Sequence, residues 1–195
     1  MMKVLGLTGG MGSGKSTIAS FFGDWGIPVY EADLEARKLS NFDPKIKQQV
    51  IELLGEESYD KDGMRRAFVA SKVFSDDALL QSLNQIIHPV VAQHFDLWLG
   101  QQQAPYCLKE AAILFETGGD QNCDWTLLIT APLEQRIERI IKRDNLSRHD
   151  ILARLEKQWP DDRKIPLADF HIENTELEAA KKAAKKIHQQ LLSNI

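Results

Sequence analysis

The chain has 195 residues, a formal net charge of −4, 43% apolar residues and two cysteines. A chain of this length can bury a sizeable core in one domain, which excludes a disordered protein and a small disulfide-stapled scaffold. The acidic balance argues against general nucleic-acid binding, because phosphate-driven binding needs a basic excess. No apolar run reaches the roughly 18 residues of a membrane span, and the cysteines lack a metal-ligand spacing, so we expect a cytoplasmic protein with reduced thiols.

The chain opens with a short apolar run, a glycine-rich loop and a helical pattern. Residues 4–8 predict a strand, and Ile18 and Phe22 follow at helical spacing. The loop between them, residues 9–16, fits GxxxxGK[ST], which a chain of this length would show by chance roughly once in a hundred cases. The sequence therefore predicts a P-loop, a strand-loop-helix unit that binds nucleotide phosphates.

The residue types in this loop explain the predicted phosphate site. Glycines allow successive N–H groups to wrap a phosphate, and the helix N-terminus adds free donors. Lys15 can bridge β- and γ-phosphates, and the Ser16 hydroxyl can ligate Mg²⁺. A P-loop specifies a nucleotide but not a reaction, so a small-molecule kinase, a GTPase switch and an ATPase motor all fit. An NKxD-like guanine segment is absent from the sequence, and the DxxG match at residues 60–63 lies in a polar turn.

Two carboxylates follow the second predicted strand, residues 27–30. If the extended conformation continues, the two-residue period places Glu31 and Asp33 on one face. A carboxylate at this edge of the sheet can accept a proton from an attacking hydroxyl or hold a water of the magnesium shell. A pair of solvated loop acids is the alternative.

The remaining pattern alternates helices with strands. Residues 34–88 predict a helical insertion, apolar runs at 106–108, 125–130 and 170–172 predict buried strands, and residues 176–192 predict a surface helix. This alternation predicts an α/β fold with a doubly wound, mostly parallel sheet, whose ligands bind at the carboxyl ends of the strands.

A locally basic segment lies within the acidic chain. Residues 134–164 contain nine Lys/Arg against seven Asp/Glu, and Arg136, Arg139 and Arg143 share one helical face. Ordinary ion pairing within the helix is one explanation. The other is a lid that closes arginines over a transferring phosphoryl group and excludes water.

These residues resemble the dephospho-CoA kinase family over nearly the whole chain. The resemblance implies transfer of the ATP γ-phosphoryl group to the ribose 3′-hydroxyl of dephospho-CoA, giving CoA and ADP in the last step of CoA biosynthesis. It is carried by Leu7 to Ser16, Glu31-Ala32-Asp33, Val73-Phe74, Ile87-His88-Pro89, Ile113-Leu114-Phe115-Glu116, Arg139 and Arg143 with Gln158, and Ala168-Asp169 with Asn174.

The resemblance also implies a three-layer P-loop kinase fold and a set of site residues. Its parts would be a core at about 1–33, 89–140 and 165–195, a CoA-binding helical insertion at about 34–88, and a lid at about 141–164. Asp33 would be the general base, with Lys15, Arg139 and Arg143 as the other catalytic residues. ATP would be held by Gly12, Ser13, Gly14, Lys15, Ser16, Thr17, Arg143 and Asn174, the last near adenine. Dephospho-CoA would contact Asp33, Arg66, His88 and Glu116, and Ser16 would bind Mg²⁺.

Three positions depart from the family pattern, namely Glu31 for Asp, Arg65 for Asp and Ala112 for Pro. Without the resemblance, His88 before Pro89 is more often a structural cap at a helix-to-strand turn. Another small-molecule or nucleoside monophosphate kinase, and a switch that only hydrolyses ATP, stay open as alternatives. We expect ATP and dephospho-CoA as the partners of a monomer or weak oligomer, and neither nucleic acid nor membrane.

Overall fold

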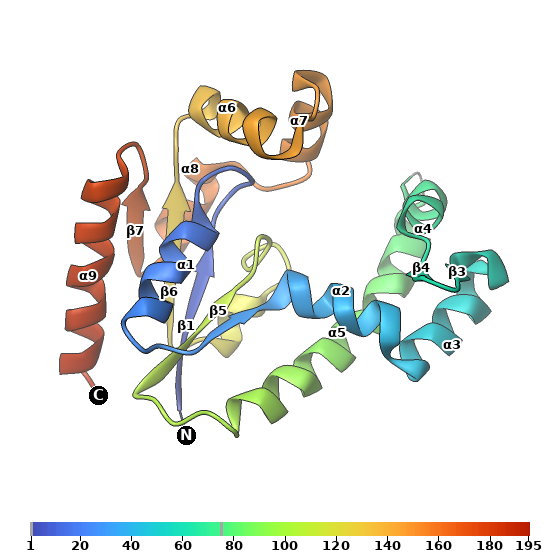
Figure 1. The fold of residues 1–195 in the computed structure, drawn as a ribbon, viewed down its shortest axis with the longest axis horizontal. Coiled ribbons are helices and arrows are strands. Elements are labelled where there is room, and N and C mark those ends of the chain that lie inside the picture. The colour runs from blue at the N-terminus through green and yellow to red at the C-terminus, as the bar shows by residue number, and fades with distance from the viewer. Residues whose placement is uncertain (1, 75) are drawn as a thin grey trace. The chain divides into compact units, whose positions relative to one another are not determined.

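The computed structural model describes residues 2–74 and 76–195 and divides them between two compact units (Figure 1). Met1 and Ser75, which fall in the predicted core and insertion, lie outside the described residues. The first unit comprises Met1–Glu31 and Gln102–Ile195, and the second comprises Ala32–Gln101. The second unit therefore extends thirteen residues past His88, where the sequence predicted the insertion to end.

The first unit is built on a five-stranded sheet in the order β2-β5-β1-β6-β7, in which every pairing is parallel. Its central strands read as continuous apolar runs because both faces are covered. The structure confirms the predicted α/β fold with a parallel sheet. The strands are β1 (Lys3–Thr8), β2 (Val29–Glu31), β5 (Tyr106–Glu110), β6 (Trp125–Thr130) and β7 (Phe170–Glu173).

Two helices cover one face of this sheet, where Ile18 and Phe22 of α1 meet Ala184 and Leu191 of α9 in the main core. On the other face, a Cβ at Gly6 would meet the side chains of Leu114 and Cys123. The helices of this unit are α1 (Lys15–Asp24), η2 (Gly119–Asn122), α6 (Leu133–Asp144), α7 (Arg148–Leu155), α8 (Asp161–Lys164), η3 (Ile165–Leu167) and α9 (Leu177–Ser193).

The second unit is mainly helical and has its own core. The Asp43 and Asp76 side chains cap α3 and α5 by accepting the N–H groups of Ile46 and Leu79. The buried core residues are Ile46, Val50, Tyr59, Val69, Val73 and Leu83. Its elements are α2 (Ala32–Phe42), α3 (Pro44–Leu54), η1 (Glu56–Ser58), β3 (Tyr59–Asp60), β4 (Gly63–Met64), α4 (Arg66–Val73) and α5 (Asp77–Leu99). The DxxG match is the predicted turn, here between β3 and β4.

The predicted helix-to-strand turn at His88 and Pro89 is wrong, because both residues lie inside the 23-residue helix α5. A proline within a helix removes one backbone hydrogen bond and usually ends or kinks the helix. Apolar residues on both sides of Pro89, among them Leu83, Ile87 and Val90, pack into the core of the second unit. This tertiary packing outweighs the local cost of the proline.

A buried histidine lies in the core of the first unit. The Nδ1 atom of His188 lies 2.6 Å from the Tyr106 hydroxyl, and its ring lies 5.3 Å from that of Trp25. The side chain is only 5% exposed. Burial, and then the nearby charge of Lys185, lower the pKa of His188, so the folded state favours the neutral imidazole.

We expect His188 to make stability depend on pH below about 6.5, the ordinary pKa of histidine. Below that pH the unfolded chain binds a proton that folded His188 resists, so the melting temperature falls. Above it, both states hold a neutral imidazole and the contribution is constant. His188→Asn should reduce the fall in melting temperature, measured by circular dichroism from about pH 8 to about pH 5. A matched His149→Asn variant, at a side chain 93% exposed, should follow the wild type. An equally steep fall in His188→Asn would contradict this account.

Candidate active site

The loop after β1 contains two glycines in a backbone conformation that other residues rarely adopt. Gly12 and Gly14 have φ values of 80° and 95°, in the left-handed region that favours glycine. The Ser13 N–H donates to the Gly10 carbonyl at 3.1 Å, and α1 begins at Lys15. No side chain caps this helix N-terminus. The N-terminus of a helix favours anions, so the position of this loop agrees with the phosphate site that the sequence predicts.

A cavity of about 230 Å³ lies where the loop, the start of α1 and one face of α6 meet. Besides Ile140, it is lined only by residues predicted from the sequence, and these are Gly12, Gly14, Lys15, Ser16, Thr17, Arg139 and Arg143. The structure therefore brings the predicted phosphate loop and two predicted arginines together around one hollow. Guanidinium and ammonium groups beside a glycine-rich loop are typical of phosphate-binding sites.

The three cations at this cavity are held differently. The Lys15 ammonium donates to the Gly9 carbonyl at 2.9 Å. Arg139 donates to the Asn174 carbonyl at 2.8 Å. Arg143 forms an exposed ion pair with Asp144 at 2.7 Å, and its hydrogen bond with that carboxylate raises the pKa of Arg143. Arg143 can thus exchange an exposed partner for a ligand more readily than Arg139, which also donates to the carbonyls of Gly12 and Ser13 and to the Gln135 side chain.

Asn174 lies behind the loop rather than at an open surface. Its side-chain amide donates to the Ser13 carbonyl at 2.8 Å, and its N–H donates to the Thr130 carbonyl at 2.7 Å. The residue is only 4% exposed. These contacts make Asn174 a support for the loop, and the predicted contact with adenine stays a prediction.

Glu110 is a site residue that sequence reasoning missed. It ends β5, and its Oε1 atom accepts the Ser16 hydroxyl at 3.1 Å. Glu31, at the end of β2, is its registered neighbour, so two carboxylates occupy partnered positions beside the loop. The available signal was an acidic residue two positions after the apolar run at 106–108, on a strand parallel to β1.

A second network joins the predicted lid to the rest of the unit. The Glu116 Oε1 atom accepts the Trp159 N–H at 3.0 Å and lies 3.4 Å from the Nζ atom of the fully buried Lys164. Gln158 donates to the carbonyl of Ala112, one of the three departures from the family pattern, at 3.4 Å. The partners shown for Glu116 are protein groups, and its predicted contact with substrate stays a prediction.

Comparison with known proteins identifies the family. A family model described as dephospho-CoA kinase matches residues 3–179. The chain belongs to the dephospho-CoA kinase family. The resemblance in the motifs is thereby confirmed.

Relatives cover almost the whole chain. A protein named dephospho-CoA kinase from Bacteroides fragilis is 36% identical over 174 residues, covering 87% of this chain and 83% of its own length. A crystal structure from Thermus thermophilus, 33% identical, superposes with a TM-score of 0.90 and covers 97% of each chain. A dephospho-CoA kinase from Campylobacter jejuni, 23% identical, has the same fold, with a TM-score of 0.71 over the full length of both chains.

The second unit contains the remaining residues expected from the dephospho-CoA kinase family. Asp33 is exposed and is the second residue of α2, two positions after β2 ends. Arg66 donates to the Arg37 carbonyl at 3.0 Å. Loss of hydration and then the charge of Arg37 lower the pKa of Arg66, which places two cations close together. His88 is exposed on α5.

Arg65, which departs from the dephospho-CoA kinase pattern, also lies in the second unit and contacts nearby residues. Its guanidinium lies 5.6 Å from the centre of the Phe68 ring and donates to the Glu57 carbonyl at 3.3 Å. A ring face attracts a cation only weakly at an exposed site. Arg65 therefore stays accessible beside Arg66.

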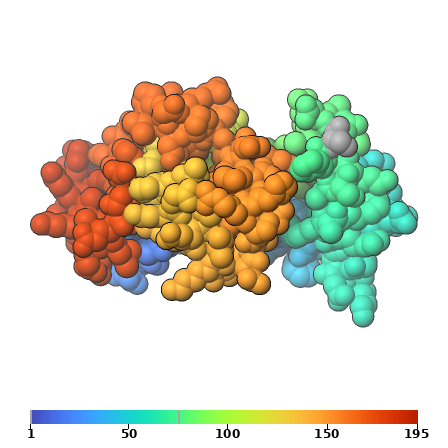
Figure 2. All heavy atoms as spheres, turned by 90° about the horizontal axis from the view of Figure 1, so that it is seen from above, coloured from blue at the N-terminus to red at the C-terminus, as the bar shows by residue number. Residues whose placement is uncertain are grey.

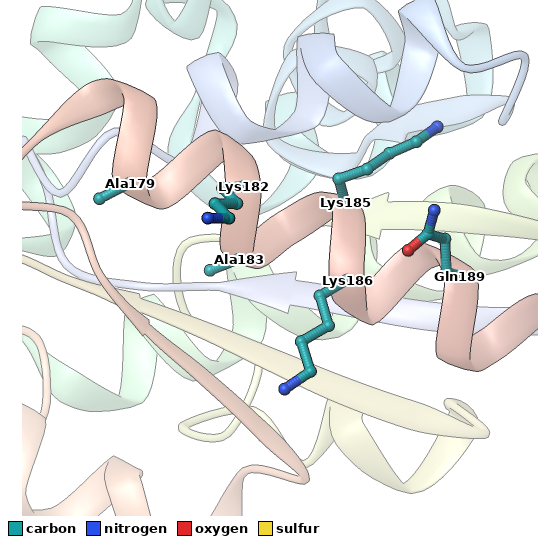
Figure 3. Close-up of a pocket in the computed structure, with 6 residues that line it drawn as sticks. All are labelled: Ala179, Lys182, Ala183, Lys185, Lys186 and Gln189. Atoms are coloured by element: carbon teal, nitrogen blue, oxygen red, sulfur yellow. The ribbon is translucent and has the colours of Figure 1, made fainter.

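A larger hollow of about 540 Å³ lies on α9, away from the phosphate loop. All its lining residues come from that helix, and the Lys185 and Lys186 side chains extend in opposite directions (Figure 3). Because these two ammonium groups point apart, they cannot bind one anion together. Among the residues that the structure describes, no helix could cross a membrane, and no cluster of three or more His, Cys, Asp or Glu residues could hold a metal.

Proposed function

We propose that this chain transfers the γ-phosphoryl group of ATP to the ribose 3′-hydroxyl of dephospho-CoA, giving CoA and ADP. Membership of the dephospho-CoA kinase family supports this ATP-dependent step of CoA biosynthesis. The observation that carries the proposal is the cavity shared by Lys15, Ser16, Arg139 and Arg143. Phosphoryl transfer needs little covalent chemistry from a protein, so positioning and charge stabilisation in such a cavity are its main requirements.

The cavity residues take complementary roles in this proposal. Gly12 to Thr17 hold the ATP phosphates at the N-terminus of α1, and Lys15 bridges the β- and γ-phosphates. Arg143 turns from Asp144 toward the transferring group, where its guanidinium stabilises the charge that spreads over the oxygens. Arg139 keeps the loop and Asn174 in place while adding positive charge to the cavity.

We further propose that Mg²⁺ binds beside Ser16. The Ser16 hydroxyl and the Glu110 carboxylate are hard oxygen ligands that touch each other, with Glu31 in register, and Mg²⁺ prefers one or two such ligands plus waters and phosphate oxygens. When bound, the ion neutralises charge developing on the phosphates. The extra methylene of Glu31 compared with Asp would shift its contact with the water shell of the ion.

Asp33 is the proposed proton acceptor for the 3′-hydroxyl. Asp33 is exposed and lies in the first turn of α2, and an exposed carboxylate can accept a proton from a hydroxyl. The cations Arg66 and Arg37 suit the diphosphate of dephospho-CoA, and His88 and Glu116 are proposed as further substrate contacts.

We also infer a reducing compartment, the cytoplasm, because both cysteines are free and Cys107 is buried. A monomer or weak oligomer is proposed. Both statements stand apart from the reaction.

An acceptor panel tests the reaction. AMP carries the same adenosine 3′-hydroxyl but lacks the pantetheine arm, so it separates a dephospho-CoA kinase from a nucleotide kinase. We expect kcat/KM for dephospho-CoA to exceed that for AMP or adenosine by at least about 10²-fold, measured by ADP release. Turnover of AMP or adenosine without turnover of dephospho-CoA would overturn the proposal.

A further inference from the structure

Met11, in the phosphate loop, forms backbone hydrogen bonds with two side chains from outside the loop. Its N–H donates to the Oε1 atom of Gln158 at 2.8 Å, and its carbonyl accepts the Nε–H of Arg136 at 2.9 Å. These bonds hold the two peptide groups that flank the Met11 Cα atom. Both backbone dihedrals of Met11 are therefore fixed by side chains 147 and 125 residues away in sequence.

Arg136 is itself anchored. Its guanidinium lies 3.3 Å from the Asp161 carboxylate, and the two side chains are 11% and 23% exposed. Burial lowers the pKa of Arg136 and the charge of Asp161 opposes this effect, so the ion pair offsets part of the cost of desolvating the guanidinium. A Cβ at Gly10 would collide with this guanidinium. Gly10 lacks a positive φ, so room for Arg136 is what its missing side chain provides.

The hydrogen bond to the Met11 carbonyl also determines the orientation of the Gly12 N–H. The Met11 carbonyl and the Gly12 N–H belong to one planar trans peptide, in which they point in opposite directions. When Arg136 holds the carbonyl, the Gly12 N–H must face the other way. Gly12 lines the phosphate cavity. The direction of the Gly12 N–H therefore depends on the hydrogen bond between Arg136 and the Met11 carbonyl.

The side chain of Met11 is also held by packing against helices α6 and α7. The Met11 side chain packs on a buried cluster that includes Ile137 of α6 and Ile151 of α7. In the view from above, the yellow and orange residues of α6 and α7 lie side by side (Figure 2). Met11 is thus held through its N–H, its carbonyl and its side chain.

We propose that Arg136 and Gln158 are positioning residues for phosphoryl transfer, which orient the peptide groups at Met11 and so direct the Gly12 N–H toward the nucleotide phosphates. Neither residue touches the reacting atoms. This proposal rests on the proposed kinase function, since it assigns the loop to ATP. It predicts a defect in the use of ATP and none in the binding of dephospho-CoA.

The test compares three variants with a matched control. Gln158→Leu removes the acceptor of the Met11 N–H, whereas Gln158→Glu keeps an acceptor oxygen there and loses only the longer bond to the Ala112 carbonyl at 3.4 Å. Arg136→Lys keeps the charge, but one ammonium cannot reproduce the fork that joins Met11 to Asp161. The control is Glu134→Gln, which breaks the exposed Glu134–Arg148 pair between α6 and α7 at 2.7 Å without touching the loop.

We expect Gln158→Leu and Arg136→Lys to lower kcat/KM for ATP by roughly 10- to 100-fold, as a misplaced donor does, with KM for dephospho-CoA unchanged. Calorimetric affinity for ADP should fall in the same variants, and Gln158→Glu should restore most of both. The combined Gln158→Leu, Arg136→Lys protein should lose less than the product of the single effects, because both bonds fix one residue.

Wild-type kcat/KM for ATP in both impaired variants would overturn the proposal, as would a Gln158→Glu protein as impaired as Gln158→Leu. A control that loses as much as the variants would also overturn it. A wild-type enzyme that binds ADP but does not phosphorylate dephospho-CoA would instead refute the proposed function. The affinity for ADP then still tests the positioning role.

Discussion

Replacing Lys15 with alanine is expected to lower kcat for CoA formation by at least about 10²-fold, the usual cost of removing one donor that stabilises developing charge. The Lys15 ammonium lies at the cavity and donates to the Gly9 carbonyl. Alanine is the strongest helix former, so α1 should still begin at this position. Steady-state ADP release with dephospho-CoA as the acceptor measures the effect.

A second lysine on the same strand-loop-helix unit provides the control for this experiment. Lys3, at the start of β1, forms an exposed ion pair with Asp124 at 2.7 Å. Lys3→Ala removes the same charge far along the strand from the loop, and surface pairs of this kind contribute little to stability. We expect its kcat to stay close to that of the wild type. Equal rates for the wild type and Lys15→Ala would refute the role of the loop in transfer.

Asp33→Asn is expected to lower kcat by roughly 10² to 10⁴-fold while the affinity for ATP changes little, because the amide cannot accept the proton of the attacking hydroxyl. Asparagine has nearly the same shape, so the first turn of α2 should be retained. Single-turnover measurements would separate this loss in chemistry from any change in the release of products.

Glu35→Gln is the matched variant for Asp33. Both acidic residues lie in the first turn of α2, where a negative charge interacts favourably with the helix dipole. Glu35 pairs only with Lys38, at 2.7 Å, so its loss should leave kcat unchanged. If Asp33→Asn retains wild-type kcat, or Glu35→Gln loses as much, then Asp33 is not the base.

The parts of the fold that the sequence predicted are those with local signals. The β6 run at 125–130 and the P-loop were read from neighbouring residues, because buried parallel strands are continuously apolar and a phosphate loop needs glycines at fixed spacing. The path of α5 could not be read in this way. Pro89 gives a local signal for a helix end, and contacts with distant helices overrule it.

For the candidate site too, the residues with local sequence signals were predicted and those that depend on distant contacts were not. The residues around the cavity were predicted because the motif and the arginine spacing are short-range patterns. Glu110, Arg136 and Gln158 reach the loop only through the folded chain, and their bonds to Ser16 and Met11 span 94 to 147 residues. The acidic residue near the end of the apolar run at 106–108 was a signal for Glu110, but nothing local in the sequence indicates the bonds of Arg136 and Gln158 to Met11. Their roles depend on the order of strands in the sheet and on where α6 and α7 pack.

The structure also explains the locally basic segment of this acidic chain. The local basic excess at 134–164 includes Arg139 and Arg143, which line the phosphate cavity, while Arg136 is paired with Asp161. Arg148 of α7 pairs with Glu134 of α6 at the surface, which is an ion pair between two helices rather than within one.

The central claim is that the phosphoryl group moves from ATP to the 3′-oxygen of dephospho-CoA. The most direct test is to incubate the protein with dephospho-CoA and ATP labelled at the γ-phosphate, and to locate the label by phosphorus-proton NMR of the products. We predict a labelled phosphate coupled to the ribose H3′ proton, with ADP formed in equal amount. Label found only in inorganic phosphate, or on another hydroxyl of the acceptor, would contradict the claim.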